Sequence, residues 1–226
     1  FIVGSFFRKD HPLMAQRVRQ SIKKGLKLSV LNPAFDDWQL SIENKICVAP
    51  IEMVAGLARI IKAVADETNQ AISCDFVDLC AQVSVDDESL AVARSLASGR
   101  RSAIWLGNYA VQHKNAAQIH ALSQEIARLV NCAFGVIGEA ANSVGGYLAG
   151  AVPFGRIEGK NAVQMLSTPL KAYILAGVEP DLDIADGVSA VKSLREAEMV
   201  AALTVFKSQS LLDLADVLLP IAPFTE

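Results

Sequence analysis

An α/β fold built on parallel sheets is predicted by two features of the sequence. Short apolar runs alternate with longer stretches of helical periodicity along the whole chain. The short runs are continuously apolar, which is typical of parallel strands whose two faces are both buried by helices. Apolar residues make up 52% of the chain and the mean hydropathy is +0.32, so we expect a neighbouring domain or subunit to cover further surface.

The individual elements follow from this alternation. Strands are predicted where apolar runs lie between turn residues, at 1–4, 27–31, 45–49, 103–107, 134–138, 172–177, 199–204 and 216–219. Helices are predicted at 12–24, 50–66, 87–98, 112–131, 160–167, 188–196 and 208–214. The helix at 112–131 is the clearest, because apolar side chains such as Ile119, Ile126 and Leu129 recur near helical spacing.

The segment 66–86 interrupts this pattern, since it is neither clearly helical nor clearly extended. We therefore expect a first Rossmann-like unit at 1–70, a linker at 71–86 and a second Rossmann-like unit at 87–226. Each unit is too short for a complete six-stranded doubly wound domain, and the first is expected to lack strands. Because Phe1 opens a buried strand without an initiator Met, and Glu226 ends the chain without a polar tail, we expect a piece of a longer protein. A processed mature chain is the alternative.

Composition excludes several classes of function. The formal charge of −3 and the scattered basic residues argue against a nucleic-acid-binding surface. The chain has no C-x-x-C motif, so its four cysteines are interpreted as reduced, buried small side chains of an intracellular protein rather than ligands of zinc or an iron–sulfur cluster: Cys47, Cys74, Cys80 and Cys132. The long apolar stretch 133–155 is broken by six glycines, which favours a strand followed by a Gly-rich loop over a membrane span.

Two turns could carry phosphate chemistry, because a strand that ends in Gly and opens into a loop lets the backbone approach an anion. The first turn has Gly4 followed by Ser5, Phe6 and Phe7, and the second has Gly177 followed by Val178, Glu179 and Pro180. Neither matches G-x-G-x-x-G, so the dinucleotide fingerprint is absent. A Gly that is required only to end a strand is the alternative interpretation of each.

The run 139–150 is the most distinctive patch, because its small residues would let a backbone pack closely against a ligand, a cluster-bearing neighbour or another strand. A tight loop packed on a neighbouring domain is the alternative. The histidines indicate no metal site, since His113 and His120 would lie about 10 Å apart on one helix face. The acidic residues after Pro180 (Asp181, Asp183 and Asp186) are expected to cap the helix at 188.

Several of these segments together resemble the molybdopterin oxidoreductase family. They are the strand and turn at 1–12 with His11, Pro12 and Leu13, the turn at 177–180, and the run A-D-V-L-L-P at 215–220. Two further runs, E-A-A-N-S-V-G-G-Y-L-A-G-A-V-P at 139–153 and P-I-A-P-F-T-E at 220–226, are similar to the large iron–sulfur subunits of bacterial NADH:quinone oxidoreductase, respiratory complex I.

The resemblance implies a Rossmann-like α/β fold of the molybdopterin oxidoreductase type, and a place in the C-terminal part of such a subunit. In working members of the family, G-x-N-P turns help to hold the guanine nucleotide ends of the cofactor. Here Phe6 and Phe7 stand in place of the first Asn and Pro, and Glu179 replaces the second Asn. A carboxylate that faces a phosphate removes a donor and adds repulsion, an effect of about 1–3 kcal/mol.

We therefore expect a scaffold domain with no catalytic residue, metal or cofactor of its own. Iron–sulfur clusters are expected in the N-terminal part of the parent chain. That part and other peripheral-arm subunits are the expected partners, on the cytoplasmic side of the bacterial inner membrane and without a direct membrane span. The candidate interface loop consists of Asn142, Ser143, Gly145, Gly146 and Tyr147, and Gly146→Val is expected to reduce assembly by forcing a Cβ into close packing. The alternatives are a cofactor-binding fragment of a true molybdenum enzyme such as a formate dehydrogenase, and an unrelated nucleotide-binding regulator.

Overall fold

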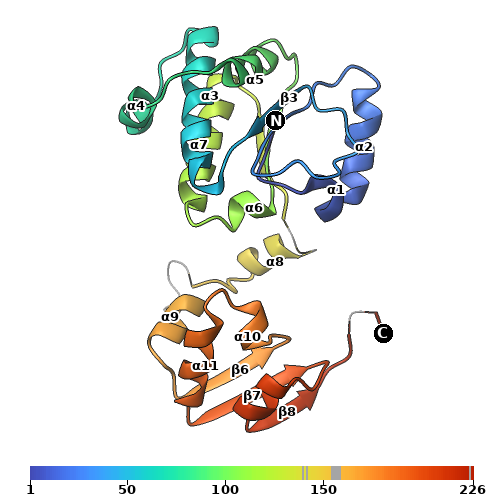
Figure 1. Cartoon of the computed structure of the whole chain (residues 1–226), viewed down its shortest axis with the longest axis vertical. Helices are drawn as coiled ribbons and strands as arrows, with labels where there is room; N and C mark the ends of the chain where they lie inside the picture. The colour runs from blue at the N-terminus through green and yellow to red at the C-terminus, as the bar shows by residue number, and fades with distance from the viewer. Residues whose placement is uncertain (139, 141, 154–158, 224) are drawn as a thin grey trace. The chain divides into compact units, whose positions relative to one another are not determined.

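The structure, a computed structural model, describes residues 1–138, 140, 142–153, 159–223 and 225–226. The chain forms two compact units, Phe1–Ser143 (unit 1) and Val144–Glu226 (unit 2) (Figure 1). Each of the eight predicted strands is present, and every strand pair is parallel. The predicted fold class is therefore confirmed.

Unit 1 is built on a five-stranded sheet with the order β3-β2-β1-β4-β5. Its strands are β1 (Ile2–Val3), β2 (Ser29–Asn32), β3 (Asn44–Cys47), β4 (Ala103–Leu106) and β5 (Ala133–Val136). The central strand β1 pairs with β2 on one side and with β4 on the other. From β1 the chain adds β2 and then β3 toward one edge of the sheet. It then returns to the centre, and β4 and β5 are added toward the opposite edge, so the strand order reverses between β1 and β4.

This pairing differs from the expected domain boundary. Residues 71–86 are not a linker between two units, because they join two halves of one sheet and contain the helix α4 (Cys74–Ala81). The expected units 1–70 and 87–226 are replaced by a division between Ser143 and Val144. The reason is that β1 needs hydrogen-bonding partners on both edges, and β4 supplies the second one from the far side of the interruption.

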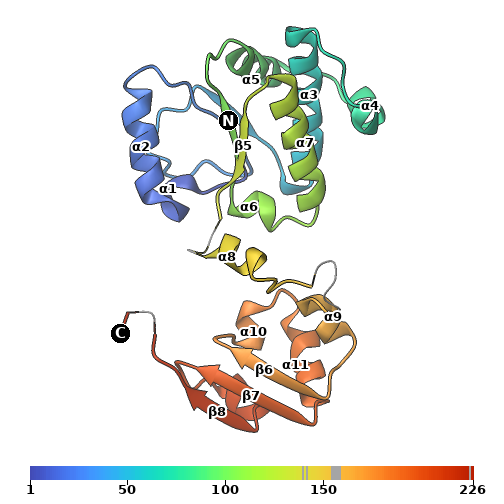
Figure 2. The ribbon, with the colours of Figure 1, turned by 180° about the vertical axis from the view of Figure 1, so that it is seen from behind.

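Helices cover both faces of the unit 1 sheet (Figures 1 and 2). The helices α1 (Phe7–Asp10) and α2 (Pro12–Ile22) lie on one side, and α3 (Met53–Thr68), α5 (Asp87–Ala97) and α7 (Ala116–Leu129) on the other. Each face has its own core: Ile60, Ile104 and Leu122 belong to the larger cluster, and Phe7 and Val30 to the smaller. In β1, β2 and β4, neighbouring residues supply opposite clusters, as the period of two along a strand requires.

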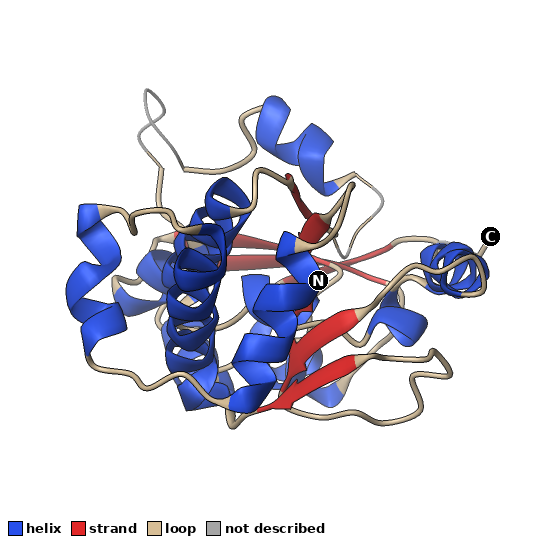
Figure 3. Cartoon of the chain, turned by 90° about the horizontal axis from the view of Figure 1, so that it is seen from above, coloured by secondary structure: helices blue, strands red, loops and turns tan. Residues whose placement is uncertain are grey.

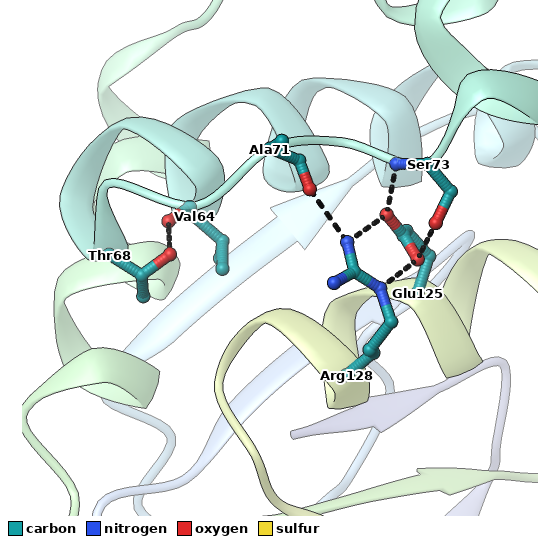
Figure 4. A network of polar contacts seen from close by, with 6 residues as sticks. All are labelled: Val64, Thr68, Ala71, Ser73, Glu125 and Arg128. Atoms are coloured by element: carbon teal, nitrogen blue, oxygen red, sulfur yellow. Dashed lines mark hydrogen bonds and ion pairs between the residues drawn. The ribbon is translucent and has the colours of Figure 1, made fainter.

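The segment that carries α4 is fixed to α7 by a buried carboxylate (Figure 4). Glu125, which is 4% exposed, accepts hydrogen bonds from the backbone N–H and hydroxyl of Ser73 at 2.8 and 2.9 Å. It also accepts two from Arg128 at 2.8 and 2.7 Å, and Arg128 donates further to the carbonyl of Ala71 at 2.7 Å. The hydrogen bonds from Arg128 are the largest cause that lowers the pKa of Glu125 to about 2, against the opposing effect of burial.

Unit 2 contains a three-stranded sheet of β6 (Ala172–Ala176), β7 (Met199–Thr204) and β8 (Val217–Pro220), in that order. Its helices are α9 (Ala162–Ser167), α10 (Pro180–Asp183), α11 (Gly187–Arg195) and α12 (Gln209–Leu214). Figure 3 colours the helices of the chain blue and its strands red. Tyr173 and Val200 face a small core with Leu194 and Leu214. Ile174 lies on the opposite face and is 76% exposed, so this sheet has an apolar face that no described helix of unit 2 buries.

Short helices account for most differences from the predicted elements. α1, α4, α10, α6 (Asn108–Val111) and α8 (Ser143–Leu148) were not predicted, because four to eight residues show little helical periodicity. α8 replaces part of the expected Gly-rich loop after β5, and Glu139 and Ala141 of that run lie outside the described residues. In the part of the chain that the structure describes, no helix has the length and apolar character needed to cross a membrane.

Candidate functional site

The first turn follows β1 in the centre of the unit 1 sheet. Gly4 has a φ of +58°, and a Cβ added there would lie 2.7 Å from the backbone nitrogen of Ala110. Its N–H donates to the carbonyl of Leu31 at 3.0 Å, in continuation of the sheet. Glycine is therefore required at this position for the strand to end against the neighbouring helix α6, whether or not a ligand binds.

The next two backbone N–H groups of the first turn also have acceptors within the chain. Ser5 N–H donates to Oδ1 of the fully buried Asn32 at 2.8 Å, and Asn32 in turn donates to the carbonyl of Ala34 at 2.8 Å. Phe6 N–H faces Oδ2 of Asp10 at 3.3 Å. Three consecutive amides that could otherwise cradle an anion are thus occupied, one of them by a carboxylate.

The two phenylalanines of the first turn contribute to packing. Phe7 is fully buried, and its ring centroid lies 6.0 Å from that of Trp105 on β4. Phe6 packs edge-on against Tyr109 of α6, with 6.3 Å between ring centroids. Such aromatic pairs stabilise the folded state by about 0.5–1.5 kcal/mol beyond the area that they bury. The side chains expected to replace the family's Asn and Pro therefore close the turn with apolar contacts.

The second turn, in unit 2, repeats the arrangement of the first. Gly177 has a φ of +64°, and its N–H donates to the carbonyl of Leu203 at 2.8 Å. Glu179 N–H donates to Oδ2 of Asp183 at 2.7 Å, and Pro180 offers no N–H. A Cβ added at Gly4 would clash with Ala110, whereas a Cβ added at Gly177 would meet nothing within 4 Å. At Gly177 only the positive φ favours glycine.

Both turns therefore place a carboxylate from four residues further along the chain against the amide where a short helix begins: Asp10 on Phe6, and Asp183 on Glu179. A phosphate at either turn would have to displace this carboxylate and meet its charge. These carboxylate–amide contacts were not predicted from the sequence, where Asp183 was expected to cap the helix at 188. The shared spacing of four residues, in F-F-R-K-D and E-P-D-L-D, was the available signal. The expected helix cap is formed by Asp186, whose Oδ1 accepts from Ser189 N–H at 3.1 Å.

The first turn meets β4 where the strand order reverses, the position at which ligands bind in open α/β sheets. Gly107 follows β4, and a Cβ there would lie 2.2 Å from Ser5 Cβ and 2.6 Å from the carbonyl oxygen of Gly4. Among the described residues, the buried atoms Ser5 Oγ and Asn108 Oδ1 near this point have no hydrogen-bond partner. The grouping of Ser5, Gly107 and Asn108 was not predicted from the sequence, since only strand pairing brings them together.

The candidate interface loop is mostly helical, and it is partly to fully exposed. Ser143, Gly145, Gly146 and Tyr147 lie in α8, and Asn142 directly precedes it. Tyr147 is 63% and Leu148 84% exposed, and a Cβ at Gly146 would meet nothing within 4 Å. The expectation that Gly146 occupies a close-packed loop is therefore wrong within this chain, because a short helix directs that position toward open space. The apolar side chains of α8 are instead available to a partner.

The cysteines and histidines show no metal centre in the described ranges, where no group of three or more His, Cys, Asp or Glu residues is placed to hold an ion. All four cysteines are free, as expected, but only Cys80 is buried. Cys47 and Cys74 are exposed, contrary to the expectation, because one lies on an edge strand and the other begins the short helix α4. His113 Nε2 lies 3.0 Å from the carbonyl oxygen of Pro50, and its Nδ1 accepts from Asn115 N–H.

Parallel sheets with flanking helices define the class as an α/β protein. The sequence matches the family model for molybdopterin oxidoreductase over residues 1–226, and the chain belongs to that family. The broad resemblance seen in the sequence is confirmed, and with it the relation to redox enzymes. A search of curated proteins found no match.

Proposed function

We propose that this chain is a scaffold part of the peripheral arm of a bacterial NADH:quinone oxidoreductase and that it binds no molybdopterin cofactor. Membership of the molybdopterin oxidoreductase family supports the fold and the redox context. The runs at 139–153 and 220–226, which resemble the large iron–sulfur subunit of that enzyme, support the finer assignment.

One observation carries the cofactor-free part of the proposal. In both glycine turns the amide that begins the following helix already donates to an aspartate of the chain, at 3.3 Å for Phe6 and 2.7 Å for Glu179. The residues present therefore do not fit the phosphates of a nucleotide cofactor, which would exchange an internal contact for repulsion from two carboxylates. Phe7, which stands where the family has Pro, is buried in the apolar core of the sheet and offers no polar group to a ligand.

In this role the chain supports electron transfer from NADH to quinone without carrying electrons. The clusters lie in the N-terminal part of the parent chain, and this part holds them and the neighbouring subunits in place on the cytoplasmic side of the inner membrane. The exposed apolar side chains of α8, among them Val144 and Leu148, provide a surface for those contacts.

A second function is favoured by the unpaired buried atoms Ser5 Oγ and Asn108 Oδ1, which lie where the strand order reverses. Buried polar atoms usually have partners, and a bound ligand could supply them. The chain would then be a cofactor-binding fragment of a true molybdopterin-dependent oxidoreductase such as a formate dehydrogenase.

Thermal unfolding in the presence of guanine nucleotides separates the two functions. We expect millimolar GMP or GDP to leave the midpoint of the purified chain unchanged, because the Phe6 and Glu179 amides already donate to aspartates of the chain. A ligand at 100 times its Kd would stabilise the fold by about 2.7 kcal/mol and raise the midpoint by more than about 5 °C. Such a rise, stoichiometric molybdenum or pterin fluorescence after denaturation would refute the cofactor-free role. Stabilisation by adenine nucleotides alone would favour the nucleotide-binding regulator.

The scaffold role predicts a defect in assembly when α8 loses its apolar surface. Leu148→Asp in the intact subunit places a charge at an 84% exposed apolar position, so the isolated fold should be retained while partner contacts are lost. We expect at least a severalfold decrease in assembled complex, measured on native gels, with unchanged NADH oxidation per assembled molecule. Gln124→Glu adds the same charge at an exposed polar position of α7, outside the candidate interface loop, and should assemble normally. Normal assembly of the Leu148 variant with slowed turnover would contradict the proposal.

A further inference from the structure

A cleft of about 550 Å³ opens at the amino edge of the unit 1 sheet, the edge opposite to the first turn. It lies between the loop 23–28 after α2 and the loop 98–102 after α5, and both loops lead into strands. Its floor is apolar and buried, with Ile2, Leu28 and Leu96 each no more than 5% exposed. Trp105 forms part of its lining.

The cleft has charge of one sign only. Lys27, Arg100 and Arg101 line it, and none of the described residues that line it is Asp or Glu. Lys27 pairs with Glu43 at 2.9 Å on the surface, whereas neither Arg100 nor Arg101 has a carboxylate partner among the described residues. This local positive charge contrasts with the formal charge of −3 for the whole chain.

The position of the arginines is not explained by helix capping alone. Basic residues are favoured in the last turn of a helix, where they compensate its dipole, but the effect falls off beyond that turn. In α5 the last-turn position is filled by Arg94, and Arg100 and Arg101 follow after the C-cap residue Ser98. Both are exposed at the rim of an apolar floor, so their charge is available to a ligand.

We propose that this cleft binds an acidic, apolar segment of a partner polypeptide. Apolar side chains of the segment would bury against the floor, while its carboxylates would accept paired hydrogen bonds from the two guanidinium groups. The volume lies within the range that accommodates a few side chains or a small ligand. The phosphates of a nucleic acid would pair with the arginines, but they would not bury the apolar floor. Outside the cleft, the net negative charge of the chain would repel them. This inference uses neither the glycine turns nor the proposed role in complex I.

Trp105 allows the proposal to be tested by fluorescence. The probe is a peptide of about ten residues in which Glu alternates with Leu, and the Trp38→Phe variant removes the other tryptophan, which does not line the cleft. We expect the Trp105 emission to change in a saturable way as the peptide binds. The affinity of the peptide should decrease as the salt concentration is raised. A peptide with Lys in place of Glu should give no saturable change. Anisotropy of a labelled peptide on the unaltered chain provides the same measurement if the Phe variant fails to fold.

Charge reversal locates the binding surface. We expect the double variant R100E/R101E to bind the Glu–Leu peptide at least about tenfold more weakly. The control K160E/K207E changes the net charge equally at exposed positions of unit 2 and should bind as the unaltered chain does. Equal binding by R100E/R101E, equal binding of the Lys peptide, or displacement of the peptide by single-stranded nucleic acid would each overturn the proposal.

Discussion

Gly107→Ala is expected to destabilise unit 1 by more than about 3 kcal/mol, a large effect for the addition of one methyl group. The added Cβ would lie 2.2 Å from Ser5 Cβ and 2.6 Å from the carbonyl oxygen of Gly4, so the backbones of two adjacent turns would have to separate. Neither neighbour is the end of a flexible side chain. The separation would weaken the pairing of β1 with β4, which holds the two halves of the sheet together.

Urea unfolding followed by circular dichroism measures this effect. Gly146→Ala provides the matched control, because the same methyl group would meet nothing within 4 Å in the short helix α8. Alanine has the higher helix propensity, so the control should be neutral or more stable by up to about 1 kcal/mol. A Gly107 variant as stable as the Gly146 variant would show that the turns after β1 and β4 are not in close contact.

Glu125→Gln is expected to have the second largest effect, a loss of about 2–3 kcal/mol at neutral pH. The carboxylate is buried and accepts hydrogen bonds from Ser73 and Arg128, and the amide of Gln cannot accept them all. The NH2 group of the introduced Gln is a donor, and it would face the guanidinium of Arg128, which is also a donor. We expect the segment 71–81 to lose protection from amide hydrogen exchange before the rest of unit 1 does.

The pH dependence of stability tests the same network. The pKa of Glu125 is lowered from an ordinary value of 4.5 to about 2 by its hydrogen bonds with Arg128 and Ser73. A depressed folded-state pKa stabilises the protein above the unfolded value, so the contribution should be complete above about pH 4.5 and lost as the pH falls toward 2. Its size is on the order of 3 kcal/mol. In Glu125→Gln this part of the acid dependence should disappear.

Glu67→Gln is the control for charge removal alone. Glu67 pairs with Arg94 at 2.9 Å, but their side chains are 30% and 64% exposed. Exposed pairs contribute about 0–1 kcal/mol, so this variant should retain nearly the whole stability and acid dependence of the chain. If the two Gln variants lost equal stability, burial of Glu125 would not be the cause of its effect.

The strands could be predicted because their signal is local. A parallel strand covered on both faces is continuously apolar, as in Ala103–Leu106, and no distant residue is needed to recognise it. The helices of four to eight residues, such as α1 and α8, gave no comparable signal because each spans little more than one or two turns. The domain boundary was misplaced for a related reason: the pairing of β1 with β4 joins residues about a hundred positions apart.

The α/β class, the family and the two glycine turns with their altered residues could be identified from the amino-acid sequence, because apolar patterning and motif residues are properties of neighbouring positions. Only the tertiary structure showed that Asp10 and Asp183 occupy the amides of these turns, and that Ser5 and Gly107 meet at the reversal of the strand order. It also placed Arg100 and Arg101 beside an apolar floor and left Gly146 in open space. Hydrogen-bond partners and close contacts depend on where distant segments lie, and strand pairing decides that.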